Sequence, residues 1–301
     1  MILATIGIEF INLGIKLENL PKGITIGGFY IAFYGMIIAT GIIAGIAMAC
    51  AEAKRTGQNV DMYMDFALYV IIACIIGARL YYVIFEWEYY SAHPEEIINL
   101  RKGGLAIYGA IIAGPIVAYI YGKVKKVSFA RIADTAILGL ITGQIIGRWG
   151  NFFNREAFGH AVSDKNLFAM RIYFDENYDI SQVPGAVAET MEKMLGKPLE
   201  EIGYIQVQPT FLYESCWNIL VLVLILIFKK YKKFEGEVFL WYLAGYGLGR
   251  FIIEGMRTDQ LIMPITGWPV SQALSIVIVV VSVLIIVTKR ALINKKIQKT
   301  A

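Results

Sequence analysis

Cysteine and histidine are scarce in this sequence, which limits the chemistry that it can support. Its 301 residues include three cysteines and two histidines, namely Cys50, Cys74, Cys216, His93 and His160. The cysteines show no spacing typical of a disulfide framework, and the histidines belong to no recognisable set of metal ligands. We therefore expect the cysteines to be packing residues, and we expect no metal and no other cofactor.

Charged residues are also sparse, whereas long apolar runs are abundant. Charged side chains make up 17% of the chain and hydrophobic ones 57%, and the mean hydropathy is +0.59. This composition excludes an ordinary soluble domain. Runs of about 20 apolar residues can cross a bilayer as helices. The sequence predicts an all-α integral membrane protein with seven transmembrane helices, over residues 26–50, 64–86, 104–122, 131–148, 211–228, 236–255 and 268–288.

Lysine and arginine gather in alternate connections between the predicted helices. They lie at residues 54–55, 123–131 and 229–233, and in the tail after residue 288. Basic connections tend to stay on the cytoplasmic side, so the N-terminus is expected outside and the C-terminus inside. The same orientation explains the net charge of +4, which therefore indicates no nucleic-acid partner.

This topology divides the chain into five parts. They are an extracytoplasmic interfacial arm at 1–25, transmembrane helices at 26–148, a small extracytoplasmic cap at 149–210, transmembrane helices at 211–288 and a basic cytoplasmic tail at 289–301. No basic residue precedes the first apolar stretch, so the arm does not resemble a cleavable signal peptide. Proline and glycine punctuate the cap, and one short helix is expected near residues 186–195.

Glycines recur at four-residue spacing in two of the predicted helices. They are Gly41 and Gly45 in one helix, and Gly139, Gly143 and Gly147 in the other. Small residues at this spacing let helix backbones approach closely in lipid. We interpret both stripes as packing surfaces.

Three arginines fall within or at the ends of predicted spans, where charge is costly. Each of Arg79, Arg148 and Arg250 would cost about 2.5–3.5 kcal/mol at the bilayer centre. The predicted topology places all three toward the outer leaflet, together with Tyr34 and Tyr108 near the outer starts of their helices. Snorkelling alone could explain Arg79, but five polar groups at one level indicate a site.

The helix predicted at 236–255 carries several of these groups on one face. Tyr246, Arg250, Glu254 and Arg257 follow one another at spacings of four, four and three residues. An ion pair between Arg250 and Glu254 within the helix is the purely structural alternative. Because guanidinium groups can clamp phosphate oxygens bidentately, Arg148 and Arg250 together favour an anionic ligand such as a phospholipid head group.

A polar segment at residues 147–159 follows directly on the fourth predicted helix. Asn151 and Asn154 can donate or accept hydrogen bonds beside Arg148. Gly150 and Gly159 are expected to permit tight turns with positive φ.

These residues together resemble the bacterial prolipoprotein diacylglyceryl transferases over most of the chain. The motifs are Tyr34-Gly35, residues 77–81, Gly103-Gly104-Leu105, residues 147–159, Gln208 to Glu214 and Tyr246 to Arg257. The resemblance implies seven transmembrane helices and a bacterial cytoplasmic membrane location, with the active site facing the outer leaflet. It implies transfer of diacylglycerol from phosphatidylglycerol to the lipobox cysteine of a prolipoprotein signal peptide, with release of glycerol 1-phosphate.

The resemblance implies functional roles for eight residues, Tyr34, Arg148, Asn151, Glu156, Gly159, Tyr246, Arg250 and Glu254, and the argument from polar groups adds Arg79, Tyr108 and Asn154. Catalytic roles are expected for Arg148, Asn151, Glu156, Arg250 and Tyr108, and substrate-binding roles for Tyr34, Arg79, Arg148, Asn154, Gly159, Tyr246, Arg250 and Glu254. Many family members carry a histidine shortly after the Gly-Gly-Leu stretch, where this chain has Tyr108. Tyrosine, with a usual pKa of about 10, normally holds its proton, so the general base is left open between Glu156 and Tyr108.

Two other functional classes compete with the transferase. A lipid or organic-anion transporter could bury arginines at one depth, but the chain shows no internal repeat of the kind that builds many transporters. A membrane scaffold with a structural charge network is the second alternative. Neither class explains the ordered motif at residues 147–159.

Overall fold

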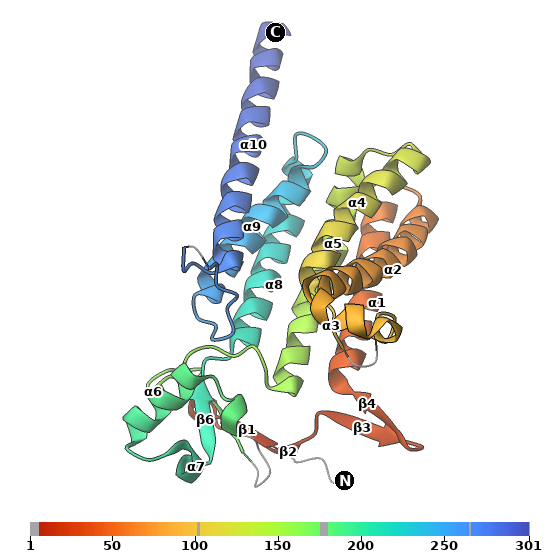
Figure 1. Ribbon diagram of the computed structural model, residues 1–301. Helices are drawn as coiled ribbons and strands as arrows, with labels where there is room; N and C mark the ends of the chain where they lie inside the picture. The colour runs from red at the N-terminus through yellow and green to blue at the C-terminus, as the bar shows by residue number, and fades with distance from the viewer. Residues whose placement is uncertain (1–5, 101–102, 175–179, 265, 301) are drawn as a thin grey trace. The chain divides into compact units, whose positions relative to one another are not determined.

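A computed structural model describes residues 6–100, 103–174, 180–264 and 266–300. Six helices in this part of the chain are long and apolar enough to cross a membrane (Figure 1). They are α1 (Phe33–Arg55), α2 (Val60–Phe85), α4 (Ile107–Lys125), α5 (Phe129–Asn154), α8 (Thr210–Phe228) and α10 (Val270–Thr300). The prediction of a mostly helical integral membrane protein is confirmed.

The seventh predicted span corresponds to α9 (Glu237–Glu254), which is not one of those six helices. Its 18 residues include three charged ones, Glu237, Arg250 and Glu254. Glu237 is fully buried and Glu254 nearly so, so protein rather than lipid surrounds these two charges. The count of seven membrane spans, and the orientation of the termini, stay predictions.

The chain forms two compact units. The first contains residues 1–44, 140–233 and 240–301, and the second contains residues 45–139 and 234–239. Helices α1, α5 and α9 each contribute to both.

Several helix boundaries differ from the predicted ones by a few residues, and three differ by more. The largest difference is in α10, which continues to Thr300, twelve residues beyond the predicted end at 288, so most of the predicted basic tail is helical. Helix α1 begins at Phe33 because residues before it form the hairpin β3 (Gly23–Ile26) and β4 (Phe29–Ala32). Gly27 and Gly28 make its turn with φ of 56° and 84°, as a two-residue hairpin turn requires. Helix α5 continues to Asn154, six residues beyond the predicted end at 148.

The glycine stripes form close contacts between α1 and α5, which confirms their interpretation as packing surfaces. In the first unit, a Cβ added at Gly41 would lie 3.1 Å from the carbonyl oxygen of Gly143. In the second unit, a Cβ added at Gly45 would lie 2.6 Å from the carbonyl oxygen of Gly139. Larger residues would separate the two helices.

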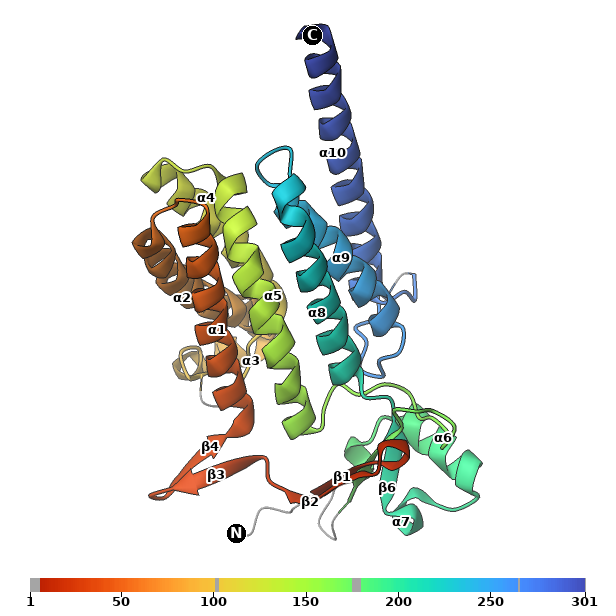
Figure 2. The same ribbon diagram turned by 180° about the vertical axis from the view of Figure 1, so that it is seen from behind.

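A four-stranded antiparallel sheet lies in the first unit, with the order β2-β1-β5-β6. Figure 2 labels three of its strands, β1, β2 and β6. Its strands are β1 (Ile6–Phe10), β2 (Ile15–Leu20), β5 (Met170–Tyr173) and β6 (Tyr204–Val207). The predicted helix near 186–195 is confirmed as α6 (Gly185–Leu195), and Val187 and Met191 pack on the sheet's core. The sequence did not indicate this sheet, which pairs residues of the predicted arm with residues of the predicted cap.

In the second unit, α2 packs against α4, and a buried carboxylate anchors the start of α9. A Cβ added at Gly77 would lie 2.8 Å from the carbonyl oxygen of Gly109, so α2 and α4 are in backbone contact. Asp134, 5% exposed, accepts hydrogen bonds from the backbone N–H groups of Gly236 (2.8 Å) and Phe239 (2.9 Å). The negative charge of Asp134 stabilises the N-terminus of α9, where the helix dipole is positive.

Candidate functional site

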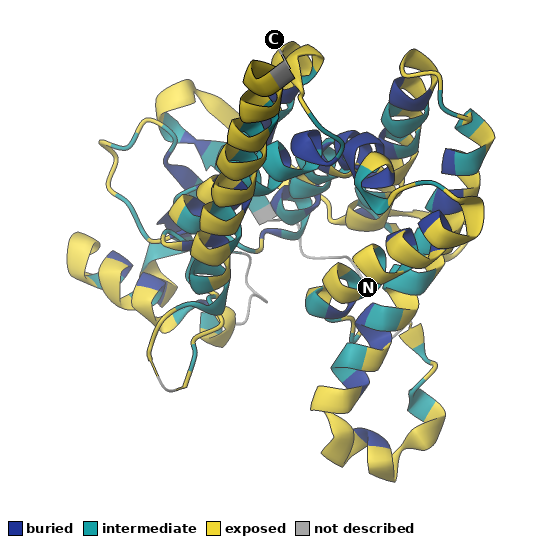
Figure 3. Cartoon of the chain, turned by 90° about the horizontal axis from the view of Figure 1, so that it is seen from above, coloured by how far each residue is buried: buried dark blue, intermediate teal, exposed yellow. Residues whose placement is uncertain are grey.

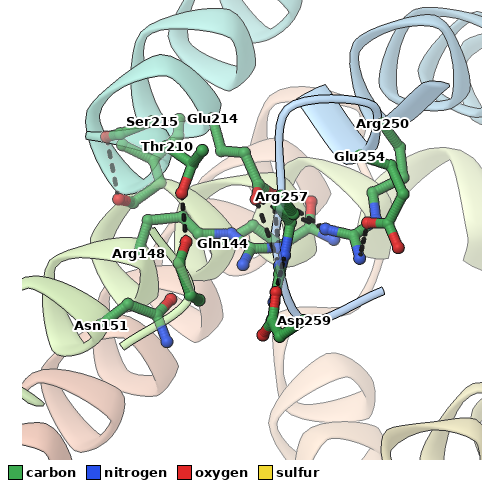
Figure 4. Close-up of polar contacts among 12 residues, drawn as sticks. Gln144, Arg148, Asn151, Thr210, Glu214, Ser215, Arg250, Glu254, Arg257 and Asp259 are labelled. Carbon is green, nitrogen blue, oxygen red and sulfur yellow. Dashed lines mark hydrogen bonds and ion pairs between the residues drawn. The ribbon is translucent and has the colours of Figure 1, made fainter. Parts of the chain in front are cut away.

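One buried carboxylate in the first unit faces three arginines. Glu214, the fifth residue of α8, is 4% exposed. Its Oε2 lies 2.6 Å from Nη2 of Arg148 on α5, and its Oε1 lies 3.4 Å from Nη1 of Arg250 on α9 (Figure 4). The same Oε1 lies 3.6 Å from Nη1 of Arg257. Glu214 thus connects the end of α5 with α9.

Two further carboxylates complete this group. Glu254 Oε2 lies 2.5 Å from Nη2 of Arg250, one helical turn away, so the intrahelical ion pair expected as the structural alternative is present. Asp259 accepts two hydrogen bonds from Arg257, at 2.9 and 2.7 Å. We call the six residues the arginine cluster; they are Arg148, Glu214, Arg250, Glu254, Arg257 and Asp259.

The arginine cluster contains three positive and three negative side chains, so it carries no formal excess charge. Each arginine already has a carboxylate within 4 Å, and the presence of arginines alone does not demand an anionic ligand. However, the contacts of Arg250 and Arg257 with Glu214, at 3.4 and 3.6 Å, are longer than the 2.7–2.9 Å of strong charge-assisted hydrogen bonds. Glu214 therefore holds Arg250 and Arg257 less closely than their other partners, Glu254 and Asp259, do.

Asp259 and Arg257 lie beyond the end of α9 and stabilise each other's charged forms. Burial opposes ionisation of Asp259, but its hydrogen bonds with Arg257 and the charge of that guanidinium outweigh burial and lower the pKa of Asp259. Burial likewise opposes the charge on Arg257, and Asp259 raises the pKa of Arg257 above its usual value. Both groups are therefore charged at neutral pH.

The polar segment after Arg148 forms a tight turn held by side chains. Asn151 Nδ2 donates a hydrogen bond of 2.9 Å to Glu156 Oε1, and the Glu156 N–H donates to the Asn151 carbonyl at 3.1 Å. Positive φ occurs at Arg155 (57°) and Ala157 (56°). This turn presents Asn151 and Glu156 together.

The prediction that Gly150 and Gly159 supply positive φ is wrong, because the turn uses Arg155 and Ala157 instead. The glycines are required for space. A Cβ at Gly150 would lie 2.8 Å from the ring of Tyr34. A Cβ at Gly159 would lie 2.8 Å from the carbonyl oxygen of Met256.

Backbone hydrogen bonds fix the turn to the other two segments of the site. The Gly159 N–H donates to the Gln208 carbonyl at 2.9 Å, just before α8, and the His160 N–H donates to the Met256 carbonyl at 2.9 Å, just after α9. Three segments that are distant in the sequence are therefore joined beside the arginine cluster.

The remaining predicted residues of the first unit include three that lie on α1, α9 and α5. Tyr34 on α1 contacts Gly150 on α5. Tyr246 on α9 stacks on Tyr242 with a centroid distance of 5.4 Å, and the Tyr242 hydroxyl donates to Gln144 Oε1 at 3.0 Å. Asn154 is the last residue of α5.

Arg79 and Tyr108 belong to the second unit. The Arg79 guanidinium is buried and donates hydrogen bonds to backbone carbonyls, including those of Ile97 (2.7 Å), Gly103 (2.9 Å) and Gly104 (2.8 Å). These hydrogen bonds satisfy the buried guanidinium, so a structural role can account for an arginine within the predicted membrane span. Tyr108 packs 6.1 Å from the ring of Tyr81. Substrate binding by Arg79 and catalysis by Tyr108 stay predictions.

Glu214 is the residue that sequence reasoning missed. It lies inside an apolar span, so the energetic argument applied to the arginines applies equally to this carboxylate. Arg257 was noted on the face of the predicted helix but was not included in the predicted site. Among the described residues, no group of three or more His, Cys, Asp or Glu side chains is arranged to hold a metal ion.

Comparisons with known proteins identify the family of this chain. A sequence model of the family described as prolipoprotein diacylglyceryl transferase matches residues 21–288. Relatives in Bacillus mycoides (strain KBAB4) and Bacillus cereus (strain G9842) are 39% identical over 268 residues, covering 89% of this chain and 91% of theirs. A relative in Bacillus anthracis is 38% identical over the same length. All three are named phosphatidylglycerol–prolipoprotein diacylglyceryl transferase.

Proposed function

The chain belongs to the prolipoprotein diacylglyceryl transferase family, and we propose that it transfers the diacylglyceryl group of phosphatidylglycerol to the lipobox cysteine of a prolipoprotein. The observation that carries the assignment of the site is the contact of Glu214 with both Arg148 and Arg250. The transporter alternative has no support from the relatives, which are transferases by name.

The reaction is a displacement at carbon. The cysteine sulfur attacks the glycerol carbon of diacylglycerol that bears the phosphate ester. A carbon–sulfur bond forms, the carbon–oxygen bond to phosphate breaks, and glycerol 1-phosphate leaves with the bonding electrons. The thiol proton passes to a base, because a free thiol with a pKa near 8.5 is mostly protonated at neutral pH.

Arg148 and Arg250 bind the phosphate and stabilise the charge on the leaving group. Both are mostly buried, with side chains 20% and 17% exposed, and charge stabilisation is strong where water is excluded. Glu254 holds Arg250 by their 2.5 Å ion pair, and Glu214 positions both guanidiniums.

The proton acceptor is Glu156 or Tyr108. The geometry favours Glu156, because Asn151 fixes one of its carboxylate oxygens and leaves the second oxygen able to accept a proton. Tyr34, Asn154 and Tyr246 contribute to lipid binding, and Gly159 keeps the turn in place. The positive-inside distribution of lysine and arginine supports a site that faces the outer leaflet of the bacterial cytoplasmic membrane.

A reconstituted assay tests the proposal. Purified protein is mixed with phosphatidylglycerol and a peptide that contains a lipobox cysteine, and thioether product and glycerol 1-phosphate are measured. Both should appear in equal amounts, and a cysteine-to-serine peptide should yield neither. If neither product forms with the cysteine peptide in folded protein, the transferase assignment to this chain is wrong.

A further inference from the structure

An apolar groove lies between α8, α9 and α10, away from the arginine cluster. Its volume is about 520 Å³, within the usual range of ligand pockets. The lining comes from all three helices and includes Val221, Ile225, Ala244, Val283 and Val287. We call it the rim groove. All of these residues belong to the first unit.

Glycines explain why the groove opens at one end of the three helices. A Cβ at Gly247 would lie 2.9 Å from Val279, so α9 and α10 are in close contact there. A Cβ at Gly245 would lie 3.0 Å from Val221, so α8 is also near. Beyond these contacts, toward Trp241 and Arg290, the helices leave the space of the rim groove.

Basic and aromatic side chains surround this end. The Arg290 guanidinium lies 5.7 Å from the Trp241 ring centroid and 3.4 Å from the Tyr231 carbonyl oxygen. Lys230 Nζ lies 5.0 Å from the Tyr231 ring centroid. Trp and Tyr mark the level of the membrane interface, and Lys and Arg beside them attract anionic lipid.

The rim groove is separate from the proposed active site. Arg250 follows Trp241 by nine residues of α9, which corresponds to about 13.5 Å of helix rise. Helix α10 exposes much of its length, as expected for a helix in contact with lipid (Figure 3).

The size of the groove favours a lipid chain over a protein helix. The lining runs from Val283 to Arg290, or about 10 Å along α10. A protein helix would be in contact with the groove over only about two turns. An acyl chain is thin enough to enter.

We propose that the rim groove binds one acyl chain of an anionic phospholipid from the leaflet on the basic side of the protein, with the lipid phosphate at Arg290 and Lys230. The groove supplies an almost wholly apolar lining for the chain, and its rim supplies positive charge for the head group. This binding does not depend on the transfer reaction.

Quenching of Trp241 fluorescence by brominated lipid tests the proposal in the full-length protein. The protein is placed in phosphatidylcholine nanodiscs that contain either brominated phosphatidylserine or the same fraction of brominated phosphatidylcholine. The Trp241 signal is the difference between the parent and Trp241→Phe. Phosphatidylserine should quench this signal at a several-fold lower fraction than phosphatidylcholine.

Two variants separate the head-group contact from the chain contact. Arg290→Gln should weaken the preference for phosphatidylserine about fivefold, because one basic residue contributes about this factor at an anionic surface. Lys295→Gln, further along α10, is the control and should not change the preference. Ala244→Phe fills the groove and should abolish quenching by both lipids, whereas Leu284→Phe, outside the lining, should leave it intact. Melting temperatures confirm that each variant is folded.

Three results would overturn the proposal. Equal quenching by the two lipids would show that the groove does not prefer an anionic head group. Unchanged quenching in folded Ala244→Phe would place the lipid chain elsewhere. A Trp241 signal that neither lipid quenches, in a protein that runs as a dimer, would assign the groove to a second copy of the chain.

Discussion

Glu214 of α8 and Arg148 of α5 form a 2.6 Å ion pair whose carboxylate is 5% exposed. A buried ion pair contributes little net stability, but removing one partner leaves the other charge uncompensated. This asymmetry makes Glu214 the residue whose replacement reports most directly on the arginine cluster.

Glu214→Gln should be destabilising and should reduce turnover. Glutamine keeps the shape of the side chain but cannot neutralise three arginines, so unfolding free energy should fall by up to about 3–5 kcal/mol. Loss of arginine positioning should lower kcat/KM about 100-fold. Glu189→Gln, exposed on α6, is the control and should change neither quantity. Parent-like turnover by folded Glu214→Gln would contradict the positioning role.

Arg148→Lys should lower the transfer rate at least about 100-fold, as removal of one preorganised donor does. Lysine retains the positive charge but loses the two-pronged geometry that suits phosphate. The rate of glycerol 1-phosphate release is the measurement. Arg131→Lys is the control, because it changes an exposed arginine paired with Glu235 at 2.5 Å, and it should not change the transfer rate. An equal loss of rate in both variants would mean that the loss does not report on phosphate binding by Arg148.

Glu156→Gln should slow transfer about 10²- to 10⁴-fold if Glu156 accepts the thiol proton. Glutamine can still accept the hydrogen bond from Asn151, so the turn should keep its structure. The pH–rate profile is the decisive measurement, since the limb that reports the base should disappear. Tyr108→Phe should retain the parent profile; loss of that limb in Tyr108→Phe instead would transfer the role to the tyrosine.

Gly159→Ala should destabilise the protein by about 1–3 kcal/mol. The added Cβ would meet the backbone carbonyl of Met256 at 2.8 Å, and a backbone atom cannot rotate away. Gly185→Ala is the matched control, because nothing lies within 4 Å of a Cβ there. Denaturant unfolding should show the loss only for Gly159→Ala; equal midpoints would contradict the close approach.

Asp259→Asn should make the unfolding free energy less dependent on pH in acid. The folded-state pKa of Asp259 lies below its usual value, so pairing with Arg257 stabilises the fold above the unfolded pKa of about 3.9 and is lost as pH falls through the lower folded pKa. Asp259 is 48% exposed, so the variant should lose only about 0–1 kcal/mol near pH 7.

Unfolding midpoints measured between neutral pH and pH 3 test the Asp259 prediction. Parent and Asp259→Asn should converge in acid, whereas Glu200→Gln on the cap should follow the parent throughout. A constant difference in midpoint between parent and Asp259→Asn at every pH would contradict the prediction, because the loss of stability would then not depend on titration of this carboxyl.

The membrane helices could be predicted because their signal is local. Hydropathy located α2, α4 and α8 within a few residues of their ends. The cap sheet could not be found in this way, because its strands are four to six residues long and pair across distant parts of the chain. Short strands carry too few residues for their alternation to be distinctive.

The candidate site was predictable in part, and the missing part has a physical explanation. Arg148, Arg250 and Glu254 were singled out because charge is expensive in a membrane, and they lie together. Glu214 satisfies the same criterion but was overlooked within its motif. The positive φ at Arg155 and Ala157 could not be predicted, because the surrounding contacts, rather than residue type, impose it.

Pairing between β1 and β5 has a consequence for the order of events during synthesis. Phe10 pairs with Met170, so the ribosome must add about 160 residues after the first strand before its partner exists. At about 5–20 residues per second, this interval lasts roughly 8–32 s. During that time α1, α2, α4 and α5 have been made while β1 lacks its neighbour. The N-terminal strand must wait, unpaired on the β5 side, until the helices between the two strands have been translated.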